Sequence, residues 1–270
     1  MLGVMTLAYD AYKIKADMPA NATDGTYYTQ NMQEVLDDSF ANAPNYKEIK
    51  RYYRTNITNV ADETVGVRVM KPFDVGKVDR DNSENFCVLS FGNLNYSMEI
   101  GDIFEFDNHK WMAVESEMHG SIYKQCLVEK CNVRLRQSTT SFKYTSSGSF
   151  IGENPLSENE IMTVWGIAKV KAKKPDLEQY NNYPDSQMDI RLPYNSFATQ
   201  ICYDLKKGTR FLLGSPVQAW QVCDIDNVSF TSLDTNNEVS NGYTLLKLNK
   251  VQEHFKDDTT LMVAWQPWYD

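Results

Sequence analysis

Few side chains in this sequence are arranged for catalysis. The three histidines are His109, His119 and His254. Two of them fall in predicted turns, and no serine or cysteine nucleophile in a recognised elbow lies near them. A Ser-His-Asp set assembled from distant residues stays open, but histidines in solvated loops explain the pattern more simply. The histidines therefore indicate no particular reaction.

Paired carboxylates are a second possible source of chemistry. Asp224 and Asp226 would lie on the same side of a strand, where they could hold a divalent ion or act as an acid/base pair. Nothing extends them into a calcium-binding loop, and no glycine-rich phosphate loop, dinucleotide fingerprint or zinc spacing is present. We expect turn or strand-end roles for them and for the pairs Asp37-Asp38 and Asp257-Asp258. The sequence thus predicts no enzyme activity, no cofactor and no metal ion.

The cysteines give no disulfide framework, because they are odd in number and scattered. Cys126 and Cys131 would face opposite sides of one strand, so they could not hold a single metal ion together. We expect buried thiols. The five positions are Cys87, Cys126, Cys131, Cys202 and Cys223.

The stretch from Glu99 to Arg136 carries the clearest structural pattern. Residues 103–106 and 111–114 are short β-prone runs, and Asp107-Asn108 between them is a turn sequence that tolerates left-handed backbone. We expect a hairpin there. A strand buried on both faces should follow at 123–130, where apolar and polar residues alternate without a clean polar side.

The same order of residues returns in the second half of the chain. Gly101 and Phe104 map onto Gly208 and Phe211 with one common shift along the sequence. A turn, a tryptophan, a valine, a glycine and a tyrosine-led strand then follow in both halves, with drift through longer loops. We predict two related β-modules in tandem.

These elements predict a mainly β fold of two small β-barrel or sandwich modules, preceded by an extended arm and a short helix. The Ser/Thr/Gly-rich stretch 138–152 is typical of a linker and marks the junction. We place the arm and helix at 1–58, the first module at 59–143 and the second at 144–270. Further strand candidates are 65–70, 86–91, 160–174, 188–192, 199–203 and 243–248.

Both ends of the chain carry apolar and aromatic residues that should be covered, either by their own module or by a partner. Apolar residues at helical spacing between Tyr28 and Phe40 predict a helix that packs either on its own module or on a neighbouring subunit. The stretch 46–54 mixes cations with tyrosines, which we interpret as a solvated face or an inter-subunit contact rather than a nucleic-acid grip. The aromatic tail should dock on its own module or on a partner. The candidate contacts are Tyr28, Met32, Leu36, Phe40, Tyr52, Tyr53, Trp265, Trp268 and Tyr269.

Composition narrows the function classes. The chain has 270 residues, of which 42% are hydrophobic and 23% charged, enough for one large or two small cores. A net charge of −9 disfavours a sequence-reading nucleic-acid binder, although an acidic wall would let DNA pass without adhesion. No apolar run approaches the length that spans a bilayer, so we expect no membrane contact and a protein made and kept in a cytoplasm.

Five segments carry a family resemblance: Gly101–Phe106 with Trp111, Cys131–Arg136, Met188–Pro193, Gly208–Phe211 and Trp220–Asn227. Together they resemble virion structural proteins of tailed bacteriophages that lie around the head-tail or collar region, over about residues 60–260. The most particular is the signature Cys-Asn-x-x-Leu-(Arg/Lys) at 131–136. Proteins of this kind carry an aromatic residue next, where this chain has Gln137.

The resemblance implies a non-enzymatic neck or head-tail connector protein, assembled into the virion in the host cytoplasm. Such a protein would form a homo-oligomeric ring, join portal to tail or other neck proteins, and surround double-stranded DNA without reading its sequence. One alternative is a tail-tip, baseplate or fibre-anchoring protein of the same particle. Another is a β-scaffold enzyme acting on carbohydrates or peptides, with Trp111, Trp165 and Trp220 stacked on sugars.

Overall fold

The computed structural model describes residues 39–54, 56, 60–71, 84–93, 96–116, 124–138, 161–171, 187–194, 205–227, 229, 231–233 and 239–266. Within these ranges the chain is almost entirely β-strand, which confirms the predicted mainly β fold with two modules in tandem. Ser39 and Phe40 lie in a helical turn. The rest of the predicted arm and helix, and the strand candidate 199–203, lie outside the described residues.

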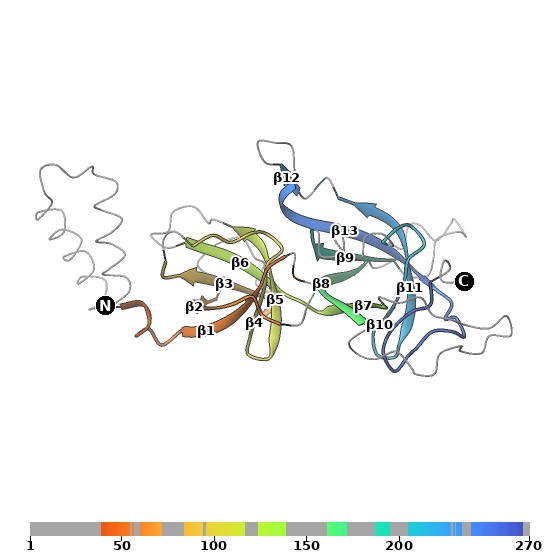
Figure 1. Ribbon diagram of the computed structural model, residues 1–270, viewed down its shortest axis with the longest axis horizontal. Helices are drawn as coiled ribbons and strands as arrows, with labels where there is room; N and C mark the ends of the chain where they lie inside the picture. The colour runs from red at the N-terminus through yellow and green to blue at the C-terminus, as the bar shows by residue number, and fades with distance from the viewer. Residues whose placement is uncertain are drawn as a thin grey trace, which may run out of the picture. The chain divides into compact units, whose positions relative to one another are not determined.

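The first sheet is a closed barrel with strand order β1-β2-β3-β6-β5-β4 (Figure 1). Its strands are β1 (Tyr46–Tyr52), β2 (Glu63–Met70), β3 (Phe86–Phe91), β4 (Ile103–Phe106), β5 (His109–Ser116) and β6 (Lys124–Lys130). Val67 of β2 lies opposite Phe91 of β3, and both are buried. Closure leaves this sheet without a free edge for unwanted pairing.

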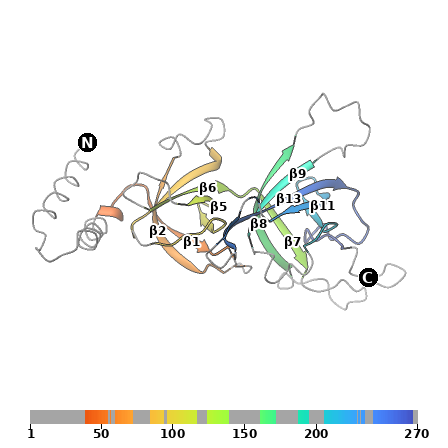
Figure 2. The same cartoon turned by 90° about the horizontal axis from the view of Figure 1, so that it is seen from above.

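The second sheet has the order β10-β11-β13-β9-β8-β7, and its two end strands lie close to each other. In Figure 2 its strands β7, β8, β9, β11 and β13 can be followed from above. They are β7 (Val133–Ser138), β8 (Ile161–Lys171), β9 (Gln187–Pro193), β10 (Arg210–Leu213), β11 (Gln218–Asp226) and β13 (Val239–Val251), while β12 (Thr231–Leu233) pairs with β13 outside this path. The core contains Leu135, Ile190, Phe211, Leu246 and Leu248.

The two sheets share one topology. If β12 is set aside, the strands of each sheet, numbered in chain order, lie in the sequence 1-2-3-6-5-4. The described residues thus contain the same arrangement twice, once as a closed barrel and once as a sheet curled until its ends approach.

A matching glycine turn precedes the first hairpin strand of each module. Gly101 has φ 98° and Gly208 has φ 100°, a left-handed conformation that glycine adopts without strain. The N–H of Gly101 donates to the Ala113 carbonyl at 2.9 Å, and that of Gly208 donates to the Val222 carbonyl at 2.8 Å. The shift found in the sequence therefore reflects a shared backbone structure.

The hairpin after each glycine has the same register. Phe104 pairs with Trp111, and Phe211 pairs with Trp220. Asp107 and Asn108 form the first hairpin loop with φ values of 50° and 61°, which suits the mirror-image turn of a two-residue hairpin. The second loop runs from 214 to 217, so its extra residues account for the predicted drift.

Two sequence interpretations need correction. The stretch 46–54 was predicted to be a solvated face or subunit contact, but it forms β1, with Ile49, Arg51 and Tyr52 buried. The junction was placed at the stretch 138–152, yet β7 before it and β8 after it pair in the second sheet. The chain passes from the first sheet to the second between Lys130 and Val133. Loop-like composition separates two paired strands as readily as two modules.

Contacts group the chain into two compact units. The first comprises residues 1–50, 64–98 and 114–128, and the second comprises 51–63, 99–113 and 129–270. Strands β1, β2, β5 and β6 contribute residues to both units. The candidate sites below each lie within one unit.

Candidate functional site

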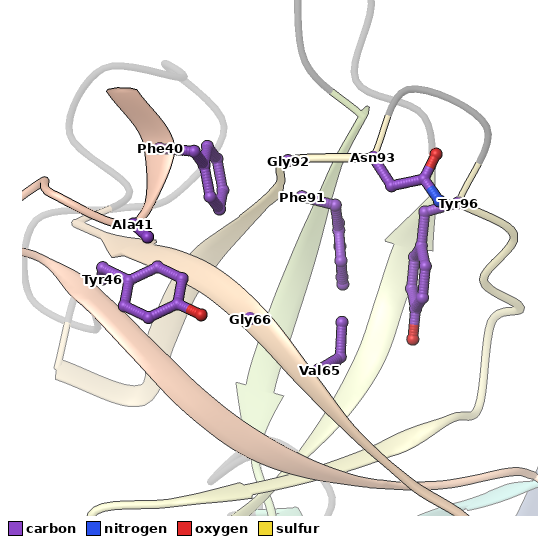
Figure 3. A pocket seen from close by; sticks show the side chains of 9 residues that line it. All are labelled: Phe40, Ala41, Tyr46, Val65, Gly66, Phe91, Gly92, Asn93 and Tyr96. Carbon is purple, nitrogen blue, oxygen red and sulfur yellow. The ribbon is translucent and has the colours of Figure 1, made fainter. Parts of the chain in front are cut away.

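A cavity of about 270 Å³ lies in the first unit (Figure 3). Four aromatic rings surround it: Figure 3 shows Phe91 and Tyr96 side by side, with Phe40 and Tyr46 across from them. The remaining lining residues are Ala41, Val65, Gly66, Gly92 and Asn93. Among the described residues that line this cavity there is no lysine, arginine, histidine or acidic residue, so these walls suit an apolar or aromatic group.

Residues distant in sequence build the cavity because three strands of the barrel meet there. Tyr46 begins β1, Gly66 lies within β2, and Phe91 ends β3. Tyr96 follows β3, and its ring stacks on Phe91 with centroids 4.5 Å apart. Phe40 meets Tyr46 edge to face at 6.1 Å. Both are preferred geometries for aromatic pairs, so the walls hold each other in place.

Two glycines let the rings approach the backbone. A Cβ at Gly66 would overlap the Tyr46 hydroxyl, and a Cβ at Gly92 would lie 2.9 Å from Cδ1 of Phe40. A glycine inside a strand often marks such a close approach. The sequence signal for this close approach is the position of the two glycines: Gly66 lies inside a valine-rich strand, and Gly92 directly follows a strand.

Arg68 fixes the segment that carries Phe40. Its guanidinium lies 4.5 Å from the centre of the Phe40 ring and donates to the carbonyls of Ser39 at 2.8 Å and Phe40 at 3.2 Å. Phe40 is 5% exposed. At this residue the side chain packs on its own module, the first of the two options that the sequence left open.

The C-terminal segment packs on the second sheet as far as Gln266, while the last two aromatic residues of the predicted tail, Trp268 and Tyr269, lie outside the described residues. The Gln266 amide accepts from the Arg210 N–H at 2.8 Å and donates to the Arg210 carbonyl at 2.7 Å. Val263 and Ala264 are buried, and Ala264 packs in a small cluster with Leu212. A side-chain amide thus pairs with the exposed edge of β10 as another strand would.

A buried carboxylate holds the turn before that segment. Asp257 accepts from Arg210 at 3.1 Å, from the His254 N–H at 2.7 Å and from the Trp265 N–H at 2.8 Å. The imidazole of His254 stacks on Trp265 with centroids 4.2 Å apart. Asp257 and His254 therefore have structural partners, which agrees with the turn role expected for the carboxylate.

The segment Cys131–Arg136 has a structural role at the start of the second sheet. The Asn132 amide donates to the Ala168 carbonyl at 2.9 Å and accepts from its N–H at 2.7 Å. Leu135 is fully buried, and Arg136 donates to the Leu261 carbonyl at 2.8 Å. Burial raises the pKa of the Cys131 thiol to about 12, which keeps it protonated and unreactive.

A buried ion pair anchors the first glycine turn. Asp102 is 1% exposed and accepts from Arg51 at 2.5 Å, from the Arg54 N–H at 2.9 Å and from the Glu99 N–H at 3.0 Å. Arg51 also pairs with Glu63 at 2.8 Å. Burial raises the pKa of the Asp102 carboxyl, while the Arg51 charge and these hydrogen bonds act in the opposite direction.

The carboxylates singled out in β11 do not form a joint site. Asp224 pairs with Lys247 at 3.1 Å and Lys207 at 3.2 Å, and these hydrogen bonds lower the pKa of its carboxyl. Asp226 instead accepts from the Ser229 N–H at 2.9 Å. Over the described ranges, no group of three or more histidine, cysteine or acidic side chains is placed to hold a metal ion.

The predicted partner contacts have mixed surroundings. Tyr52 is buried and donates to Glu105 at 2.5 Å, with Lys110 against its ring. Tyr53 is 41% exposed and Trp265 is half-buried. Tyr28, Met32, Leu36, Trp268 and Tyr269, like His119, lie outside the described residues.

The tryptophans proposed to stack on sugars lie mostly inside the fold. Trp111 and Trp220 are buried at equivalent hairpin positions, so neither offers a ring face to a glycan. Trp165 is half-buried and shares its surroundings with the cations Lys110 and Arg134. The sugar-binding arrangement expected of the enzyme alternative is therefore not formed by these three residues.

Comparison with known proteins gives no family match, no curated relative and no similar solved structure. Among the residues with described positions, no helix has the length and apolar character required to cross a membrane.

Proposed function

We propose that this protein is a non-enzymatic structural component of a tailed-phage virion, specifically a neck or head-tail connector subunit that forms a ring between portal and tail. The observation that carries the proposal is the duplicated module: one strand order, one glycine turn and one hairpin register occur twice. A repeated scaffold suits an assembly subunit, because it multiplies surfaces that neighbouring subunits can use.

The resemblance to virion proteins adds support at the residues that carry it. Asn132, Leu135 and Arg136 of the signature each hold part of the second sheet, so the signature marks a scaffold that related virion proteins would share. The overall charge of −9 suits a subunit that surrounds DNA without adhering to it.

Labelling of purified virions tests the proposal. Gold-conjugated antibody against this chain should mark the junction between head and tail in electron micrographs, and the chain should co-purify with the portal. Labelling at the distal end of the tail would move the protein to the tail-tip alternative. Absence from mature particles would end the proposal.

A glycan panel tests the enzyme alternative. We expect no turnover above background from the wild type. Turnover that disappears in both Asp224→Asn and Asp226→Asn would favour an enzyme instead.

A further inference from the structure

The aromatic cavity of the first unit has the size of a socket for one side chain. Pockets for whole small ligands measure about 300 to 1,000 Å³, and this cavity measures about 270 Å³. Large aromatic side chains seated in pockets of this kind are frequent anchors of protein–protein contacts. Because the described lining residues include four aromatic rings and no charged group, a neutral aromatic side chain is the best-matched occupant.

The chain itself carries a candidate anchor. Of its five tryptophans, Trp111 and Trp220 are buried in hairpins, while Trp165 and Trp265 are half-buried against neighbouring side chains. The fifth, Trp268, comes two positions after Gln266, whose amide is fixed to the edge of β10. Its point of attachment is therefore set by the second unit, and Tyr269 follows it.

We propose that Trp268 of one copy inserts into the aromatic cavity of the next copy, with Tyr269 packed beside it. This inference rests on the proposed ring function and names one contact that would build the ring. Tail and cavity are different surfaces, so the contact is heterologous and each copy can give one anchor and receive one. Such contacts form a closed ring when the rotation between copies closes.

A peptide assay tests the contact itself. The probe is a fluorescein-labelled peptide of residues 262–270, and the receptor is the full chain with Trp268→Ser and Tyr269→Ser, so that its own tail does not compete. We expect saturable binding by fluorescence anisotropy. A peptide carrying Trp268→Ser should bind at least tenfold more weakly.

A second receptor variant checks that the peptide uses this cavity. Ala41 is exposed and lines the cavity, so Ala41→Phe in the receptor should fill it and weaken peptide binding by a similar factor. The matched control is Glu48→Phe, which adds the same ring at an exposed position of β1 outside the cavity and should leave binding unchanged. Circular dichroism would confirm that both variants fold.

A mixing experiment tests whether the contact joins two copies. The tail variant keeps its cavity and the Ala41→Phe variant keeps its tail, so each should be monomeric alone by native mass spectrometry. Mixed together they should form a dimer and nothing larger, because only one complementary contact is left. If no dimer forms in the mixture, the proposal is overturned, and the occupant of the cavity would be a segment of the same chain.

The outcomes separate this inference from the ring itself. If wild-type chains form rings but both peptides bind equally, or both variants still assemble, the tail-to-cavity contact is wrong while the ring stands. If the peptide binds selectively and the mixed variants form a dimer, but wild-type chains form no closed ring, the contact stands and the connector proposal fails.

Discussion

Gln137 directly follows the segment 131–136 and lies in β7. It is 1% exposed, and neither atom of its amide group has a hydrogen-bond partner. In β7 it lies two residues after Leu135, so both side chains face the core of the second sheet. A buried amide without a hydrogen-bond partner destabilises the folded state.

Replacing this amide should stabilise the protein. We expect Gln137→Met to raise the free energy of unfolding by about 1 to 2 kcal/mol, because the substitution removes two unpaired polar atoms without much change in volume. Urea denaturation followed by tryptophan fluorescence would measure it. Gln221→Met is the matched control: that amide donates to the Gly208 carbonyl at 3.1 Å, so its loss should not stabilise. A lower midpoint for Gln137→Met would contradict the burial argument.

Asp102 and Thr209 occupy the same place in the two glycine turns. The Asp102 carboxylate accepts from the Glu99 N–H at 3.0 Å, and the Thr209 hydroxyl accepts from the Lys206 N–H at 3.0 Å. Both side chains are buried. The turn therefore requires a hydrogen-bond acceptor at this position in both modules. The negative charge at this position is found only in the first module, where Asp102 pairs with Arg51.

A double-mutant cycle separates these two roles. Asp102→Thr should keep the turn but leave Arg51 without its main partner, with a loss of about 3 kcal/mol. Combining it with Arg51→Met should cost less than the sum of the two single variants, since the unpaired guanidinium is gone. Thermal and urea unfolding of the four proteins would measure the coupling. Strict additivity would show that the ion pair adds no stability.

At the scale of elements, two side-chain amides form hydrogen bonds with strand backbone of the kind that a neighbouring strand would form. Asn132 pairs with the backbone of Ala168 beyond the first residue of β7, and Gln266 pairs with the backbone of Arg210 at the edge of β10. Each amide satisfies one N–H and one carbonyl that would otherwise lack partners. The second sheet is thus completed by side chains where the first is completed by strand closure.

Removal of the C-terminal amide should loosen that edge. We expect Gln266→Leu to lower the free energy of unfolding by about 1 to 2 kcal/mol and to speed amide hydrogen exchange at Arg210, because both bonds to its backbone are lost. Gln252→Leu, at an exposed neighbouring position, should change neither. Unchanged exchange at Arg210 in Gln266→Leu would show that the amide contributes little to this edge.

Most described strands were predictable from alternation and turn residues. The hairpin around Asp107-Asn108 and the repeat through Gly101 and Gly208 depend on local backbone rules that the sequence displays directly. β1 was missed because its pattern reads as charged and aromatic: Arg51 is buried against the carboxylates of Glu63 and Asp102, and Asp102 lies far along the chain. The junction was misplaced because pairing of β7 with β8 is non-local.

At the scale of the whole molecule, the net charge governs behaviour toward DNA. With a charge of −9, the protein should give no retained complex with linear duplex DNA at ~150 mM salt in an electrophoretic mobility assay. The tail variant that combines Trp268→Ser and Tyr269→Ser has the same net charge as the wild type, so it should likewise give no retained complex with DNA in this assay. Tight binding that weakens steeply with salt would instead indicate a local basic surface and contradict passive surrounding of DNA.

The cavity could not have been derived from sequence. Its walls come from residues before and in β1, within β2, and at and after the end of β3, and the side-by-side arrangement of these three strands brings them together. Gly66 and Gly92 hint at a tight approach of other groups, but neither identifies the ring that comes near. Phe40 is buried, and the guanidinium of Arg68 lies over its ring, a partner that helical spacing does not reveal. The other residues of the predicted apolar stripe lie outside the described residues.

The likeness of the two hairpins raises a problem during biosynthesis. A growing chain contains two hairpins with the same pairing register, and each could pair with strands of the other module before its own module is complete. Arg51 discriminates between them: with the second hairpin beside it, Thr209 would stand where Asp102 belongs, and a guanidinium would be sealed from water without its carboxylate. We therefore expect the Arg51–Asp102 pair to disfavour incorporation of the second hairpin into the first sheet.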